Sequence, residues 1–217
     1  MPTVTLGDLQ QRIWSRLDQN TLLYPSAIVT QKINESIRCV NLLTGLIQTT
    51  VTQLSQKNRF WYSIVGTGLI YPTRVQFGNT YLEPTSFLQL GRSRPNWPTE
   101  TSANQLTQPV SWFPYGFRTV GIYPADANGG EVISITGCAE PPVLVNPTDT
   151  INLPNSVFAA FDELAVTSLV LKESPKTFAQ ASTNYQEFLR QIKAITIFRS
   201  WIAPRYWISE AQQPVNR

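Results

Sequence analysis

The sequence predicts an α+β protein in which N- and C-terminal helices form a bundle, with an antiparallel β-sandwich or barrel-like sheet inserted between them. Apolar residues recur at helical spacing in segments 1–47 and 141–196. Between these segments, residues 48–140 are rich in Thr, Val, aromatic residues, Gly and Pro, which is typical of short strands joined by turns. Gly45 and the Pro141–Pro142 pair mark the two junctions, because glycine favours a helix end and consecutive prolines make a stiff linker.

The N-terminal segment is expected to form two helices. Thr5 and Asp8 have the spacing of a capping box, in which each side chain accepts a hydrogen bond from the other residue's backbone N–H. An apolar stripe with a spacing of four follows, formed by Leu9, Ile13 and Leu17. The second helix is expected to begin near Pro25 and to end at Gly45, which can adopt the left-handed conformation of a C-cap.

The middle segment is expected to contain about six strands, a number that suits a small sandwich or barrel-like sheet. Gly78–Asn79 separates two runs with strand composition, so it predicts a hairpin turn. A second hairpin is expected between 117–123 and 132–136, joined by the turn 126–130. Residues 86–108 are interpreted as a long exposed excursion with one helical turn at its start, and long loops of this kind often carry function.

Two further helices are expected at the C-terminal end, beginning near Leu153–Pro154 and Ser174–Pro175. The last helix has apolar residues at alternating steps of three and four, which is a heptad-like pattern that requires a helical partner. Its members are Phe178, Ala181, Tyr185, Phe188, Ile192 and Ile195. An extended arm, residues 197–217, is expected to follow, because Pro204 interrupts any helix there.

Composition favours an interaction protein over a monomeric enzyme. Charged residues make up 14% of the chain, against about 25% in typical soluble domains. A surface with so little charge is expected to be covered by other subunits. The net charge of +3 is only mildly basic, so it does not indicate a surface that grips nucleic acid. With no run of about 18 apolar residues, no membrane-spanning helix is expected, and the N-terminal residues lack the pattern of a signal peptide.

Several catalytic and cofactor sites are excluded by residue content. The chain has no histidine, so Ser-His-Asp triads, Cys-His pairs and ordinary zinc sites are impossible. No glycine-rich phosphate-binding motif is present. We therefore predict no enzymatic activity, no cofactor and no metal. The adjacent Asp162 and Glu163 are interpreted as part of a solvated helix face, and Asp126 as a turn residue. Cys39 and Cys138 are expected to be free thiols, although one disulfide remains an alternative.

The order of these segments resembles the head-to-tail adaptor proteins of tailed bacteriophages, including the tail tubular adaptors of short-tailed phages. The resemblance is carried by the capped first helix, by the second helix with Ile33–Arg38 and its stop at Leu42–Gly45, and by the strands after it. It continues in the proline-rich linker, in Leu153–Pro154, and in a last helix that contains Tyr185, Phe188 and Leu189. It is a pattern of architecture that covers most of the chain, without a single diagnostic motif.

The resemblance implies a ring under the portal protein, usually of twelve subunits, that continues the DNA channel and provides the platform for tail attachment. The expected partners are other copies of the chain, the portal, tail, nozzle or fibre proteins, and double-stranded DNA passing without sequence-specific binding. No membrane partner is expected. The implied location is the neck of the virion, after assembly in the cytoplasm of the bacterial host.

Three groups of candidate contact residues follow from this interpretation. Large apolar and basic side chains are expected to form a portal-docking arm, consisting of Arg199, Trp201, Ile202, Arg205, Tyr206, Trp207, Ile208 and Arg217. A loop with Arg92, Arg94 and Trp97 is expected to contact a neighbouring subunit or a tail protein. Polar or charge-balanced helix positions are candidates for lining the channel, namely Gln10, Gln11, Arg12, Gln186 and Arg190.

Two alternatives remain open from the sequence. The chain could be another structural protein of the neck or tail. It could also be a carbohydrate- or receptor-binding module, in which Trp61, Trp97 and Trp112 act as stacking platforms for the ligand.

Overall fold

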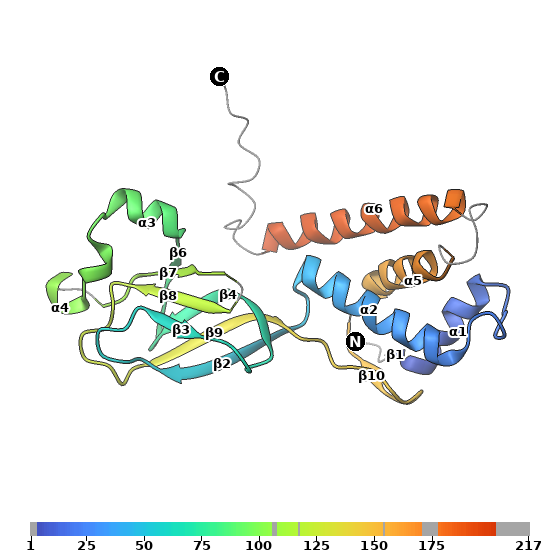
Figure 1. Ribbon diagram of the computed structural model, residues 1–217, viewed down its shortest axis with the longest axis horizontal. Coiled ribbons are helices and arrows are strands. Elements are labelled where there is room, and N and C mark those ends of the chain that lie inside the picture. The colour runs from blue at the N-terminus through green and yellow to red at the C-terminus, as the bar shows by residue number, and fades with distance from the viewer. Residues whose placement is uncertain (1–3, 106–107, 117, 154, 171–177, 203–217) are drawn as a thin grey trace, which may run out of the picture. The chain divides into compact units, whose positions relative to one another are not determined.

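The computed structural model describes residues 4–105, 108–116, 118–153, 155–170 and 178–202 (Figure 1). It is a mixed α/β structure with several antiparallel sheets, which confirms this part of the prediction. The chain divides into two compact units. One comprises Met1–Leu46 and Pro141–Arg217, and the other comprises Ile47–Glu140.

The first helix of the helical unit, α1 (Leu6–Arg16), begins at the predicted capping box. The Thr5 hydroxyl accepts a hydrogen bond from the Asp8 N–H at 3.1 Å, and Asp8 Oδ2 accepts one from the Thr5 N–H at 3.0 Å. The cap satisfies backbone donors that a helix start otherwise leaves unpaired. Immediately before α1, β1 (Val4–Thr5) pairs antiparallel with β10 (Thr150–Ile151), so residues far apart in sequence meet at the start of this helix.

Helix α2 (Ser26–Thr44) follows Pro25 and ends at Gly45. Gly45 has the left-handed conformation, with φ of 56°, and its N–H bonds to the Asn41 carbonyl at 2.6 Å. This C-cap was predicted and is confirmed. The buried side of α2 is an apolar stripe made of Val29, Ile33, Ile37 and Val40.

Helices α5 (Asn155–Val170) and α6 (Phe178–Ile202) complete this unit. Helix α5 contacts α1, α2 and α6, and α6 also contacts α2. Of the heptad-like positions on α6, Ala181, Phe188 and Ile192 are buried, whereas Tyr185 is exposed. The helix continues through Ile202, so an extended arm beginning at residue 197 is wrong for its first six residues. No proline precedes Pro204 in that stretch, and the helix therefore has no reason to stop earlier.

The second unit contains two four-stranded sheets, whose strand orders are β2-β9-β4-β5 and β3-β8-β7-β6. The first consists of β2 (Gln48–Leu54), β9 (Val132–Ala139), β4 (Leu69–Phe77) and β5 (Thr80–Tyr81). The second consists of β3 (Trp61–Ser63), β8 (Thr119–Tyr123), β7 (Ser111–Pro114) and β6 (Glu83–Pro84). One apolar cluster takes buried side chains from both sheets, among them Val75 and Ile135 from the first and Trp112 and Ile122 from the second.

One of the two predicted hairpins is confirmed. Strands β4 and β5 pair across Gly78–Asn79, with Phe77 opposite Thr80. The second is wrong, because β8 pairs with β3 and β7, whereas β9 pairs with β2 and β4 in the other sheet.

The turn between β8 and β9 is held by the end of β2. Asp126 Oδ2 accepts a hydrogen bond from Ser55 Oγ at 2.6 Å, and the Ser55 N–H donates to the Glu131 carbonyl at 2.7 Å. Asp126 also accepts hydrogen bonds from the N–H groups of Asn128 and Gly129, which confirms its role as a turn residue. These bonds hold the connection that passes from β8 in one sheet to β9 in the other, beside the end of β2.

The excursion at 86–108 has more structure than the sequence predicts. It contains α3 (Phe87–Ser93), the 3₁₀-helix η1 (Trp97–Thr99) and α4 (Ser102–Gln105). The predicted helical turn at its start is present, since the Ser86 hydroxyl caps α3 by accepting from the Gln89 N–H at 3.0 Å. None of the helices in the described ranges is long and apolar enough to cross a membrane.

Candidate interaction surfaces

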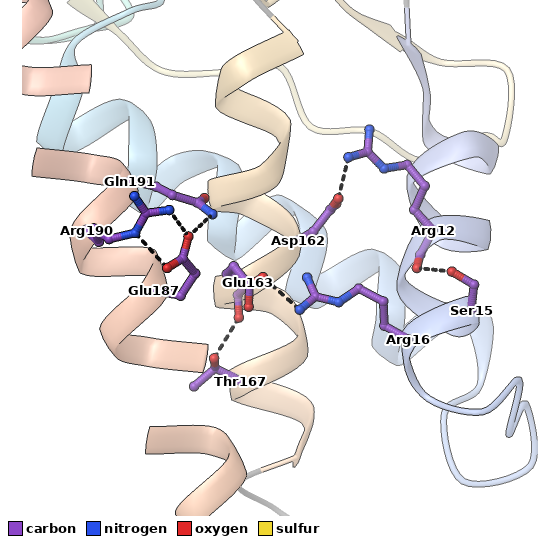
Figure 2. A network of polar contacts seen from close by, with 9 residues as sticks. All are labelled: Arg12, Ser15, Arg16, Asp162, Glu163, Thr167, Glu187, Arg190 and Gln191. Atoms are coloured by element: carbon purple, nitrogen blue, oxygen red, sulfur yellow. Dashed lines mark hydrogen bonds and ion pairs between the residues drawn. The ribbon is translucent and has the colours of Figure 1, made fainter. Parts of the chain in front are cut away.

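Two ion pairs connect α1 to α5 (Figure 2). An Arg12 guanidinium nitrogen lies 2.6 Å from Asp162 Oδ2, and an Arg16 nitrogen lies 2.7 Å from Glu163 Oε1. The two arginines are four residues apart and therefore share one side of α1. The prediction of a solvated face at Asp162 and Glu163 is wrong, because α1 covers them and leaves their side chains 6% and 12% exposed.

Burial changes the ionisation of Asp162. It raises the pKa of Asp162 from 3.8 to about 6, and the nearby Arg12 charge only partly opposes the shift. Asp162 Oδ1 and Glu163 Oε2 are buried without a hydrogen-bond partner among the described residues. Each carboxylate therefore has one oxygen in an ion pair and one without a partner in the described part of the chain. Because burial costs such charges much of their hydration, we expect these ion pairs to add little net stability.

The candidate channel residues divide into buried and exposed groups. Gln10 is 7% exposed and donates a hydrogen bond to Thr30 Oγ1 at 2.7 Å, so it connects α1 to α2 and is not a lining residue. The Arg12 side chain is held in an ion pair with Asp162 of α5. Gln11 and Gln186 are exposed, as a lining role requires. The exposed Arg190 makes two hydrogen bonds to Glu187, at 2.8 and 2.6 Å, which lower the Glu187 pKa to about 2.

The predicted portal-docking arm falls largely outside the described residues. Arg199, Trp201 and Ile202 lie in the helical backbone of α6, but their side chains are not among those described. The remaining arm residues lie outside the described ranges altogether; they are Arg205, Tyr206, Trp207, Ile208 and Arg217. The arm stays a prediction.

The predicted contact loop loses one of its three residues. Trp97 is 6% exposed and packs edge-on against Phe60, Trp61 and Phe113, with ring centroids 5.4 to 5.8 Å apart. Arg92 and Arg94 are exposed, so they remain available to a partner. Trp97 was placed on a contact surface because tryptophan is common in interfaces, but here it closes the aromatic core beneath α3.

The same packing argues against a row of tryptophan stacking platforms. Trp112 is 1% exposed in the apolar core between the sheets, and Trp97 is buried in the aromatic cluster. Trp61 is half-buried, and the edges and faces of its ring meet Trp97, Phe113 and Tyr115. A sugar ring needs an open aromatic face, which the two buried tryptophans do not offer.

An apolar tip between α1 and α2 was missed by the sequence analysis. Leu22 is 93% exposed and Leu23 is also exposed, yet the turn that carries them is well bonded. Trp14 Nε1 donates to the Tyr24 carbonyl at 3.0 Å, and Asn20 Oδ1 accepts from the Leu23 N–H at 3.1 Å. The available signal was a pair of leucines that fits the apolar periodicity of neither flanking helix.

No group of three or more Cys, Asp or Glu side chains is arranged to hold a metal ion within the described ranges. Cys39 and Cys138 are free thiols, one half-buried and one buried. The features that stand out are an exposed apolar turn, exposed arginines and a low content of charged residues, which are typical of a protein that makes contacts with other proteins.

The chain belongs to the SU10 adaptor protein family, whose model matches residues 4–215. The family name denotes a phage adaptor, a structural component of the virion neck, and the predicted resemblance to head-to-tail adaptors is thereby confirmed. Comparison with curated proteins gives no match.

Proposed function

We propose that this protein is the head-to-tail adaptor that forms a ring, of twelve subunits, beneath the portal of a tailed phage. The ring extends the DNA channel and provides the platform on which tail, nozzle or fibre proteins assemble, and it carries out no enzymatic reaction. The observation that carries the proposal is the family match over residues 4–215. The low content of charged residues supports extensive contacts between proteins.

The two units are assigned different tasks. The helices of segments 1–47 and 141–196 form one bundle that makes the ring body, and the β-sandwich of residues 48–140 faces the tail or the outside. Contacts of α5 with α1, α2 and α6 support a shared helical body. The exposed Leu22 and Leu23 give this body an apolar contact point for a neighbouring subunit.

The lining of the channel is proposed to pass DNA without holding it. Gln11 and Gln186 are uncharged and exposed, and the charge of Arg190 is balanced by its hydrogen bonds to Glu187. Affinity for duplex DNA depends on the number of phosphates neutralised, so such a lining binds weakly. The isolated protein is therefore expected to show no submicromolar affinity for duplex DNA in physiological salt.

The C-terminal segment is proposed to dock on the portal. After the end of α6 at Ile202, the sequence still contains Tyr206, Trp207 and Ile208, together with Arg205 and Arg217. Aromatic and arginine side chains are favoured at the centres of interfaces. The exposed Arg92 and Arg94 are proposed to contact a neighbouring subunit or a tail protein.

Mixing the full chain with purified portal and imaging by electron microscopy tests the proposal, and added ring density below the portal is the expected result. Truncation after Ile202, which keeps α6 intact, is expected to leave the helix content unchanged and to abolish docking. The matched control is the double variant Arg92→Ala/Arg94→Ala, which is expected to dock. Full docking of the truncated chain would contradict the arm, and absence of any ring with the full chain would contradict the adaptor assignment.

A further inference from the structure

Strand β2 is an unusually long open edge. It spans seven residues and pairs only with β9, whereas the opposite edge of the same sheet, β5, has two. The edges of the other sheet are also short, with three residues in β3 and two in β6. Figure 1 shows β2 beside β9 and at the border of its sheet. Strand β4 is covered by β5 only at Gln76 and Phe77, but it contains Pro72 and two register shifts, which discourage pairing along its open side. Among the strands described, the risk of further pairing is therefore greatest at β2.

The hydrogen bonds at its two ends reveal which backbone groups point outwards. The Ser55 N–H bonds to the Glu131 carbonyl at 2.7 Å, and the Ala139 N–H bonds to the Ile47 carbonyl at 2.9 Å. Because antiparallel ladder bonds alternate along a strand, the odd-numbered residues of β2 face β9. The N–H and C=O groups of Thr50, Thr52 and Leu54 consequently point towards the open edge.

Strand β2 lacks the features that usually prevent an edge strand from pairing with another chain. Its residues include no charge and no proline, and its pairing with β9 runs from Gln48 to Leu54 without a bulge. Natural proteins normally discourage edge pairing with lysine, proline, bulges or very short strands. Their absence here indicates that this edge is meant to be paired.

We propose that β2 pairs antiparallel with β2 of a second copy of the chain, about a two-fold axis at Val51. In this register Thr50 of one copy lies opposite Thr52 of the other, and the outward N–H and C=O groups meet in hydrogen-bonded pairs. Threonine side chains also meet where β2 pairs with β9, since Thr50 Oγ1 lies 2.8 Å from Thr136 Oγ1. The strand carries no charge, so self-pairing places no like charges opposite each other.

A second copy fits the edge better than the other strands of a neighbour would. Pairing of β2 with the two-residue β5 edge would leave most of β2 uncovered. Pairing with itself covers all seven residues and closes at two copies, as an isologous contact must. Neighbouring subunits of a closed ring meet through two different surfaces, whereas this pairing joins two copies of the same surface. The pairing is therefore a separate association and does not depend on the adaptor proposal.

Disulfide trapping tests the register in the full chain carrying Cys39→Ala and Cys138→Ala. Two copies of Val51 face each other in a non-hydrogen-bonded pair with Cα atoms about 4.5 Å apart, which suits a disulfide. Val51→Cys is therefore expected to give a covalent dimer under mild oxidation. Gln53→Cys is the matched control, since it lies on the same face of β2 but is roughly 13 Å from its symmetry mate at about 3.3 Å per residue.

Sedimentation of the unmodified chain provides the second test. Concentration-dependent dimers are expected, and Thr52→Lys should weaken them at least tenfold, whereas Thr80→Lys on the opposite edge should not. A chain that stays monomeric at every concentration, dimers that survive Thr52→Lys, or equal crosslinking through Gln53→Cys would each overturn the proposal. Ring formation on the portal is expected to be unaffected by Thr52→Lys. Failure of the dimerisation tests would therefore not count against the adaptor function.

Discussion

The helical unit and the β unit bury polar groups in different ways. The helical unit places Asp162 and Glu163 between α1 and α5, where each meets one arginine and keeps one oxygen without a hydrogen-bond partner in the described part. The β unit buries Asp126, whose two oxygens accept from a serine hydroxyl and from two backbone N–H groups. Backbone donors are plentiful in turns but are consumed by the ladder inside helices, so the helical unit depends on side-chain charges.

This difference has consequences for stability. Asp162 loses much of its hydration where α1 covers it, and this burial raises its pKa to about 6 although Arg12 lies beside it. We therefore expect the helical unit to respond to pH and the β unit to respond mainly to changes in apolar packing.

The largest expected effect comes from removing one large core side chain in each unit. Trp112→Ala in the β unit and Phe158→Ala in the helical unit, both almost fully buried, should each lower the free energy of unfolding by about 3–5 kcal/mol. Hydrogen exchange should show faster exchange in the unit that carries the substitution and little change in the other. Equal loosening of both units by either variant would mean that the two units unfold as one.

A smaller effect on the free energy of unfolding is expected from a change of pH, and it should arise in the helical unit. Burial raises the pKa of Asp162 from 3.8 to about 6, so the folded state holds this proton more tightly than the unfolded state does. The contribution of Asp162 to the free energy of unfolding is therefore greatest below about pH 4 and declines as the pH rises through 6, by about 3 kcal/mol in total. Urea unfolding between pH 4 and pH 7 measures this slope.

Asp162→Asn should remove that part of the slope. The control is Glu187→Gln, which should leave the slope between pH 5 and pH 7 unchanged, since the pKa of the exposed Glu187 is about 2. A slope that persists in Asp162→Asn would show that another group controls the pH response.

The smallest expected effect concerns the start of α1. Thr5→Ala removes the hydroxyl that caps the helix at the Asp8 N–H and should lower the free energy of unfolding by about 1 kcal/mol. Thr5→Ser keeps the hydroxyl and should be close to the unmodified chain. Urea unfolding followed by circular dichroism distinguishes the two, and an equal loss for both would show that the threonine methyl group matters more than the cap.

Features that depend on a few neighbouring residues were predicted well. The Thr5–Asp8 cap, the left-handed Gly45 and the Gly78–Asn79 turn all appear where the sequence places them, because each depends on backbone geometry within one or two turns. The second hairpin failed because its two strands find better partners elsewhere in the chain. Sequence adjacency predicts a hairpin only when no distant strand competes.

The candidate contact residues show the same limit. Residue type alone suggested that Gln10 and Trp97 lie on surfaces, but Gln10 hydrogen-bonds between two helices and Trp97 closes an aromatic cluster. The exposed Leu22 was missed for the opposite reason, since leucine is usually buried.

The sequence by itself determined the order of helices and strands, the absence of histidine-dependent chemistry and the resemblance to phage adaptors, because these follow from local pattern and composition. Only the tertiary structure decided which strands share a sheet, which face of α5 receives arginines and which edge remains open. These outcomes depend on competition between segments that are distant in sequence, and the winner is set by packing and by hydrogen bonds that no local pattern records.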